Sequence, residues 1–185
     1  MPFKYINGLK IFCFEKLLEH GVSHGIFSRR GGLSPSPWAS LNVGGTVGDD
    51  PERVRLNKEN MITALDFVPQ SAFEVWQVHS NRVVVADSPR GENPLLKADG
   101  IICCEPGIPL LMRFADCVPL FLFDPVLRAV AVVHAGWKGT ALRTARKVVE
   151  EMQQVFNSKP GDICACIGPS IGPDHYEVGP DVIES

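Results

Sequence analysis

The fold is decided by the stretch VPLFLFDPVLRAVAVVHAGWKGT, residues 118–140. Two runs of β-branched and large apolar residues flank the Asp-Pro pair at 124–125, a pattern typical of two strands joined by a turn. After the glycines that follow, apolar residues recur at helical spacing. We therefore predict two strands and then a helix, over 118–124, 128–136 and 140–156. The apolar face of this helix comprises Leu142, Ala145, Val149, Met152 and Phe156.

Four further segments have the composition of strands. They are FEVWQVHSNRVVVA at 73–86, GIICC at 100–104, PLLMRF at 109–114 and DICACIGPSIG at 162–172, the last a buried strand that runs into a turn. Strands outnumber helices, they do not alternate regularly with them, and no internal repeat is present. We therefore predict an α+β fold. The 185 residues fit a single domain spanning 1–185.

Residues 22–48 are rich in Gly, Ser and Pro and have neither strand nor helix periodicity, so we predict a long loop. Trp38 and Leu41 favour an ordered loop, and ordered loops of this length are usually functional. Asp50 and Pro51 then have the pattern of a helix start. This helix should end before Pro69.

Composition restricts the classes of function. The formal net charge of -3 gives no basic footprint for nucleic acid. There is no apolar run of about 18 residues and no signal-peptide pattern, so we expect a cytoplasmic protein without a membrane span. The cysteines are expected to be reduced thiols, and four of them to be small apolar packing residues: Cys103, Cys104, Cys164 and Cys166.

Three candidate metal ligands, His79, Cys117 and His134, each lie at or near the end of an apolar run. Side chains at strand ends can converge on one edge of a sheet. Two imidazoles and a thiolate with an open fourth position match catalytic zinc. The same set occurs in blue-copper sites, but zinc ranks above copper because no nearby His and Met follow Cys117. The alternative is two solvated histidines and a buried thiol.

The motif HAGWKGT favours an anion. Gly136 and Gly139 allow close backbone approach, Lys138 carries charge, and Thr140 begins the predicted helix, whose free N–H groups attract anions. The motif is not a P-loop, and a turn without a ligand is the alternative. The arginines at 29–30 could also reach a phosphate.

Two acidic residues accompany these candidates. Asp116 precedes Cys117 and could orient a ligand or act as a general base, or it could be a turn residue. Asp99, in ADG, is predicted to be a turn residue.

Eight segments in order resemble the YfiH-like family, which carries an older laccase or polyphenol oxidase label. They are HGIFSRRGG, LNVG, GDDPERVRLN, WQVHSNRV, ADG, ADCVPLFLFDP, VAVVHAGWKGT and IGPSIGPDHYEVGPDV, and they cover about residues 24–183. The combination of ADC with HAGWKGT makes the resemblance specific.

The resemblance implies a layered α/β sandwich related to toxin-like cysteine hydrolases. It also implies a zinc site at His79, Cys117 and His134. The implied activities are phosphorolysis of adenosine, inosine, guanosine and methylthioadenosine, and deamination of adenosine, so that the expected partners are purine nucleosides and inorganic phosphate. A homodimer is compatible with the sequence. The residues assigned to phosphate or substrate are Arg29, Arg30, Asn42, Lys138 and Thr140, and those assigned to catalysis are Cys117, Asp116 and His134.

The sequence departs from the family pattern in three places. Phe114 stands where Thr is usual before Ala-Asp-Cys, and Lys138 replaces an Arg, which keeps the charge but loses bidentate geometry. The chain ends at Ser185, whereas family members continue, so we expect the usual C-terminal elements to be missing. Three alternatives remain open: a metal-free cysteine hydrolase with Cys117 as nucleophile and His134 as base, a copper phenol oxidase, and a non-catalytic remnant.

Overall fold

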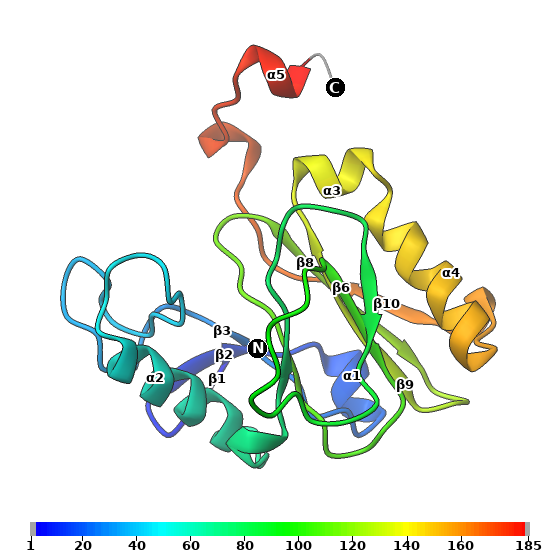
Figure 1. Ribbon diagram of the computed structural model, residues 1–185, viewed down its shortest axis with the longest axis horizontal. Helices are drawn as coiled ribbons and strands as arrows, with labels where there is room; N and C mark the ends of the chain where they lie inside the picture. Colours follow the sequence, from blue (N-terminus) through cyan, green and yellow to red (C-terminus); the bar gives the residue numbers. More distant parts are fainter. Residues whose placement is uncertain (1–2, 184–185) are drawn as a thin grey trace. The chain divides into compact units, whose positions relative to one another are not determined.

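The computed structural model in Figure 1 describes residues 3–183, so Ser185 lies outside the described residues. The chain divides between Ala72 and Phe73 into two compact units, and each is described by itself. The single domain spanning 1–185 stays a prediction. Both units combine helices and strands, which confirms a mixed α and β fold.

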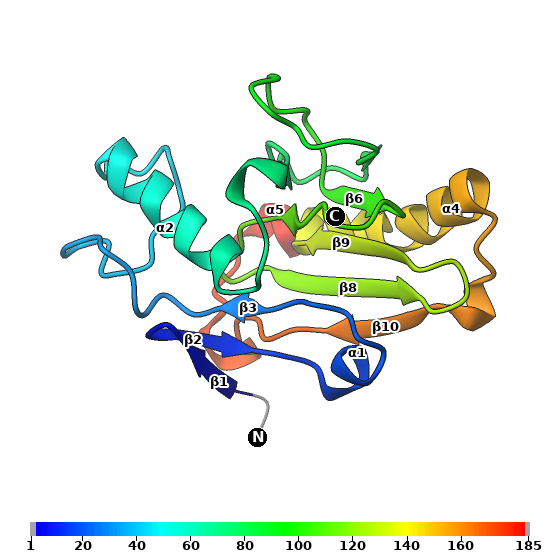
Figure 2. The ribbon, with the colours of Figure 1, turned by 90° about the horizontal axis from the view of Figure 1, so that it is seen from below.

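The first unit contains a small antiparallel sheet with strand order β1-β2-β3 (Figure 2). Its strands are β1 (Phe3–Ile6), β2 (Leu9–Phe12) and β3 (Ile26–Phe27), and its helices are α1 (Glu15–Glu19), α2 (Pro51–Thr63) and the 3-10 turn η1 (Pro69–Ser71). The predicted start of α2 is confirmed, because the Asp50 side chain accepts a hydrogen bond from the backbone N–H of Glu52.

The long loop between β3 and α2 is ordered by a buried side chain of α2. Asn57 is fully buried, and its Oδ1 accepts from the N–H of Leu33 at 2.9 Å. Its Nδ2 donates to Asn42 O at 2.8 Å and to Ser34 Oγ at 3.0 Å. Because one amide bonds both to Leu33 and Ser34 and to Asn42 further along the loop, the polar segment can be ordered without regular secondary structure.

The second unit is built on a mixed five-stranded sheet of order β10-β8-β9-β6-β5. Its strands are β5 (Val83–Val85), β6 (Gly100–Cys103), β8 (Val118–Asp124), β9 (Ala129–Ala135) and β10 (Cys164–Ile167), and a separate parallel pair is formed by β4 (Phe73–Glu74) and β7 (Leu110–Leu111). The predicted hairpin is confirmed: β8 and β9 pair antiparallel from Val118 with Ala135 to Asp124 with Ala129. Asp124 Oδ1 accepts from the N–H groups of Val126 and Leu127 and so closes the turn.

Helix α4 (Thr144–Phe156) covers one face of this sheet (Figure 1). Val148 and Met152 are fully buried there against residues of β6, β8 and β9 such as Ile102 and Val133. The helix lies close to the backbone at Gly100, where a Cβ would come within 2.6 Å of Val148 Cγ2. A second buried cluster, which includes Phe73, Val75, Ile101, Met112 and Val132, fills the other face. Both faces of the central strands are buried, which explains their almost continuous apolar sequence.

The helix predicted over 140–156 is broken in two. A short helix α3 (Trp137–Ala141) is followed by Arg143 with a φ of 57°, and α4 begins one residue later. A left-handed residue cannot continue a helix. The buried row of α4 is therefore Thr144, Val148 and Met152, whereas Leu142, which was placed on the apolar face of the predicted helix, is exposed.

Several strand predictions were too long. Only the ends of 73–86 form strands, and PLLMRF contributes only β7. Strand β10 is half-buried, because Ile167 is 69% exposed while Cys164 and Cys166 face inward. The cysteines are free thiols, as predicted, but Cys104 is exposed.

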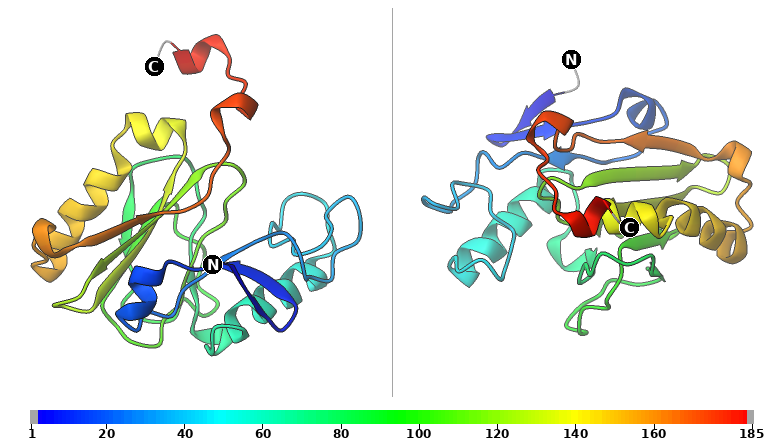
Figure 3. Two further views of the ribbon diagram at one scale, coloured as in Figure 1. Left: turned by 180° about the vertical axis from the view of Figure 1, so that it is seen from behind. Right: turned by 90° about the horizontal axis from the view of Figure 1, so that it is seen from above.

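After β10 the chain passes through the 3-10 turn η3 (Pro173–His175), and the described residues end with the short helix α5 (Pro180–Ile183), on the same side of the sheet's end as α3 (Figure 3). A further 3-10 turn, η2 (Pro160–Asp162), precedes β10. Among residues 3–183, no helix has the length and apolarity needed to cross a membrane.

The role of Asn57 predicts a large effect on stability. Asn57→Ala leaves several buried groups of the loop without partners, and we expect it to lower the free energy of unfolding by about 3 kcal/mol in urea titrations. Asn60→Ala, the same change at an exposed position of α2, is the matched control and should cost well under half of that. Equal effects of the two variants would contradict the role given to Asn57.

Candidate metal centre

The structure brings the three predicted metal ligands together. The donor atoms of His79, Cys117 and His134 all lie within 4.8 Å of one another. His134 lies next to the end of β9, opposite Pro119, and Cys117 is the residue directly before β8. Hairpin register therefore sets these two side by side. The apolar run before Cys117 forms only the short strand β7, and the strand that directly adjoins Cys117 is β8, which follows it.

His79 comes from the irregular segment between β4 and β5 and has a φ of 56°, in the left-handed region. Its ring lies edge-on to that of His134, with the centroids 4.9 Å apart. Phe114, the first departure from the family pattern, lies with its ring centroid 5.6 Å from that of His134. His79 is exposed, Cys117 is half-buried and His134 is buried, so the cluster has an open side at His79.

The centre of the site is a carboxylate that was predicted to be a turn residue. Asp99 is fully buried, and its Oδ1 lies 2.8 Å from His134 Nδ1. It also accepts from the backbone N–H groups of Val78 at 3.3 Å, His79 at 3.0 Å and Ser80 at 2.6 Å, and from Ser80 Oγ at 2.8 Å. The available signal was an acidic residue directly before the apolar run GIICC.

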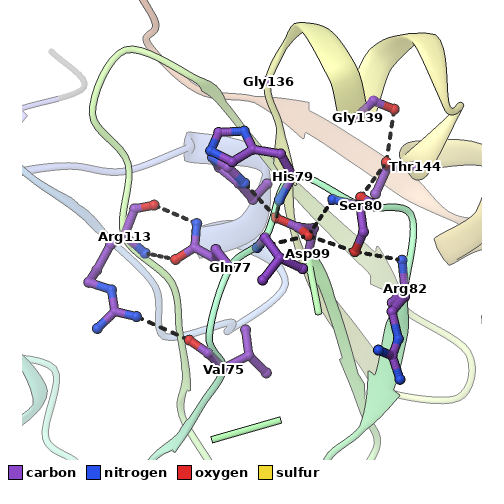
Figure 4. Close-up of polar contacts among 12 residues, drawn as sticks. Val75, Gln77, His79, Ser80, Arg82, Asp99, Arg113, Gly136, Gly139 and Thr144 are labelled. Carbon is purple, nitrogen blue, oxygen red and sulfur yellow. Dashed lines mark hydrogen bonds and ion pairs between the residues drawn. The ribbon is translucent and has the colours of Figure 1, made fainter. Parts of the chain in front are cut away.

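A side-chain amide joins the segments that carry His79 and Cys117. Gln77 Nε2 donates to Arg113 O at 2.7 Å, and the Arg113 N–H donates to Gln77 Oε1 at 2.8 Å (Figure 4). The amide takes the place of a backbone unit and extends the pairing of β4 with β7 towards the site.

The glycine-rich motif is packed against the cluster rather than open around it. A Cβ at Gly136 would lie 2.9 Å from Cys117 Sγ and 3.2 Å from His79 Nδ1. Behind it, the hydroxyl of buried Thr144 lies 3.0 Å from Ser80 O and 2.8 Å from Gly139 O, which links this motif to the His79 segment.

The residues predicted to bind phosphate are divided between the two units. Lys138 and Thr140 are exposed on α3, whose five residues make a weaker anion site than the long helix that was predicted. Arg29, Arg30 and Asn42 belong to the first unit. Asn42 has a structural role there, because its Nδ2 donates to Asp49 Oδ2 and its Oδ1 accepts from the N–H of Gly44. Phosphate binding by these five residues stays a prediction.

Burial and hydrogen bonding set the charges in the site. Burial lowers the pKa of His134 and outweighs the hydrogen bond to Asp99, so this imidazole is neutral at pH 7. Burial raises the pKa of Asp99, but hydrogen bonds from Ser80 and His134 outweigh it and keep the carboxylate ionised. Burial raises the pKa of Cys117, and the charges of Asp116 and Asp99 raise it further.

These groups fit a metal ion. A neutral imidazole that donates its Nδ1–H to a carboxylate presents Nε2 to the metal, as metal-binding histidines commonly do. His79 and the Cys117 sulfur complete a nitrogen and sulfur donor set suited to zinc or copper rather than to magnesium or calcium. The carboxylate that contacts His134 is Asp99 and not Asp116, whose side chain is exposed.

Comparison with known proteins identifies the family. Residues 23–185 match the sequence model described as "Multi-copper polyphenol oxidoreductase laccase". The chain belongs to this laccase-like, YfiH-type family. A Bacteroides thetaiotaomicron relative named purine nucleoside phosphorylase is 34% identical over 184 residues, covering 95% of this chain and 68% of its own length. The Bacillus subtilis relative named purine nucleoside phosphorylase YlmD is 40% identical over 171 residues, covering 89% and 62%.

Solved structures of the YfiH family agree with this assignment. YlmD from Geobacillus stearothermophilus superimposes with a TM-score of 0.88 at 31% identity, and YfiH from Bacillus licheniformis with 0.86 at 33%. Each comparison covers 99% of this chain and 70% of the other. The chain thus spans about two thirds of the length of these YfiH-type relatives.

The position of Gly136 gives a direct test of the site. Its backbone conformation suits any residue, so Gly136→Ala should fold, but the new methyl group would displace Cys117 or His79. We expect zinc binding to weaken by about tenfold or more, measured by competition with a chromophoric chelator. Gly161→Ala, at a position with no neighbouring atoms, should bind zinc as the unmodified protein does. Unchanged binding in Gly136→Ala would contradict the geometry.

The raised pKa of Cys117 predicts that metal binding depends on pH. The thiol keeps its proton at pH 7 and must release it to become a ligand, so acid opposes binding. Between pH 8 and 7 we expect the affinity for zinc to fall by about tenfold for each proton released. Calorimetry in two buffers should detect this proton release in the unmodified protein and equally in Cys104→Ser. An affinity that is independent of pH would exclude Cys117 as a ligand.

Proposed function

We propose that the protein is a zinc-dependent purine nucleoside phosphorylase whose metal is held by His79, Cys117 and His134. The observation that carries the proposal is this His-Cys-His cluster, with its open side, in a chain whose relatives are named purine nucleoside phosphorylases. The proposed substrates are adenosine, inosine, guanosine and methylthioadenosine with inorganic phosphate, and adenosine deamination is a second proposed reaction. We also propose that the protein is cytoplasmic and that it forms a homodimer.

In phosphorolysis, a phosphate oxygen bonds to C1′ of the sugar while the bond from C1′ to the base breaks. The electron pair leaves with the base, which takes up a proton. In deamination, the oxygen of water bonds to C6 of adenosine and ammonia leaves. A zinc ion in this site would supply Lewis-acid polarisation of an oxygen ligand for either reaction.

The remaining roles, which are proton transfer and the binding of phosphate, are assigned to side chains of the protein. His134 is neutral and fixed by Asp99, so it offers one defined nitrogen. Asp116, exposed beside Cys117, is proposed as the general base or acid that exchanges the proton. Lys138 and Thr140 are proposed to bind phosphate, for which the Thr140 hydroxyl would turn its O–H from Gly136 O to a phosphate oxygen. Arg29, Arg30 and Asn42 are proposed to contribute from the first unit.

The reaction is tested by the release of hypoxanthine from inosine in the presence of phosphate. Because Lewis-acid stabilisation amounts to several kcal/mol, His79→Ala and Cys117→Ser should each lower kcat/KM by about 100-fold or more. Both should also lose zinc. Cys104→Ser, which removes an exposed thiol of the same unit, should retain full activity. Phosphorolysis by a zinc-free His79→Ala protein would refute the proposal.

A metal-free cysteine hydrolase is a weaker alternative. A nucleophilic thiol needs a lowered pKa or an adjacent base, whereas burial and two carboxylates raise the pKa of Cys117. The fold comparisons give no support to the cysteine-hydrolase label either. Slow alkylation of Cys117 in chelator-treated protein is the expected result.

A copper phenol oxidase is favoured only by the description of the family model. The same three donors would suit copper, so the test is spectroscopic. An intense visible absorption band after copper loading, together with turnover of a phenol, would favour this alternative over the zinc enzyme.

A further inference from the structure

One carboxylate contacts both histidines of the metal centre by different routes. Asp99 Oδ1 lies 2.8 Å from the ring nitrogen Nδ1 of His134 and accepts from the backbone N–H of His79 at 3.0 Å. The side chain of Asp99 has no exposure to solvent. No water therefore competes for its oxygens, and its partners fix its position as it fixes theirs.

The contact with His134 decides which ring nitrogen can bind a metal. An ionised carboxylate only accepts hydrogen bonds, so Nδ1 of the neutral ring must carry the proton. The lone pair is then on Nε2, the nitrogen not engaged by Asp99. With the proton on the other nitrogen, Nδ1 and the carboxylate would repel each other, and no lone pair would face the metal.

The contacts of Asp99 with the turn at 78–80 fix the backbone position of His79. Three successive N–H groups, those of Val78, His79 and Ser80, converge on the Asp99 carboxylate, and the Ser80 hydroxyl adds a fourth donor. Successive N–H groups that point at one anion form a compact anion-binding turn. His79 adopts a φ of 56°, which is unfavourable for a residue other than glycine, and the ionised carboxylate stabilises this conformation.

We propose that Asp99 is the positioning residue of the metal centre and holds both histidine ligands, His134 through its ring tautomer and His79 through its backbone. This proposal rests on the proposed metal site but not on the reaction carried out there. It implies that the two histidines respond together to a change at Asp99.

The first experiment measures zinc affinity by chelator competition, without any nucleoside. Asp99→Asn keeps the size of the side chain but replaces one oxygen by an NH2 group, so either the His79 segment loses its acceptor or His134 must accept through Nδ1 and lose the lone pair on Nε2. We expect zinc binding to weaken by about 10- to 100-fold. Asp87→Asn, which removes the same charge from an exposed position of the same unit, should have no effect.

Ser80→Ala separates positioning from stability. It removes one donor to Asp99 but leaves the carboxylate and its contact with His134, so zinc binding should weaken by less than about fivefold. The unfolding free energies of all three variants are measured without metal. If Asp99→Asn is destabilised but binds zinc as tightly as the unmodified protein, Asp99 is only a structural residue and the proposal is wrong.

A second measurement uses the unmodified protein and does not depend on the folding of any variant. In nitrogen-15 NMR of the zinc-loaded protein, the proposal requires a protonated Nδ1 and a metal-bound Nε2 on His134. A proton on Nε2 with metal on Nδ1 would overturn it. A protein that shows the expected tautomer and the loss of affinity in Asp99→Asn, yet does not cleave nucleosides, would refute the proposed function and leave this inference standing.

Discussion

An ionised carboxylate without access to water costs several kcal/mol to bury unless hydrogen bonds replace its hydration. Asp99 meets this condition with the three backbone N–H groups and the Ser80 hydroxyl of the turn at 78–80, and with the ring of His134. Because the buried carboxylate needs all of these donors, the position of the turn at 78–80 and that of His134 on β9 depend on each other. Neither histidine can move far without removing a hydrogen bond from this buried carboxylate.

The surrounding structure supplies the remaining constraints on the site. The register of the β8–β9 hairpin, in which Val118 pairs with Ala135, places Cys117 beside His134. Gln77 ties the His79 segment to Arg113 on the chain that leads to Cys117. Gly136 leaves room for the two ligands that its own Cβ would otherwise touch. The fold therefore brings the three donor side chains together.

The sequence alone predicted those parts of the molecule that depend on local pattern. The hairpin over 118–136, the start of α2 at Pro51 and the three candidate ligands follow from apolar periodicity, capping residues and ligand chemistry. Three features could not be predicted from the sequence: the break between α3 and α4 at Arg143, the interruption between β4 and β5, and the role of Asp99. Each depends on partners far along the chain, such as Ser80 for Thr144 and His134 for Asp99, which local propensity does not reveal. Phe114 and Asn42 illustrate the same limit, since their neighbours are known only from the structure.

The central claim is that one ion is bound by two imidazoles and one thiolate, and X-ray absorption at the zinc edge tests it most directly. For the zinc-loaded protein, the account predicts one sulfur at about 2.3 Å and two imidazole nitrogens at about 2.0–2.1 Å, with one further light atom completing a tetrahedron. A shell without sulfur, or with two or more sulfurs, would show that the ion is bound by other residues and would contradict the assignment of His79, Cys117 and His134.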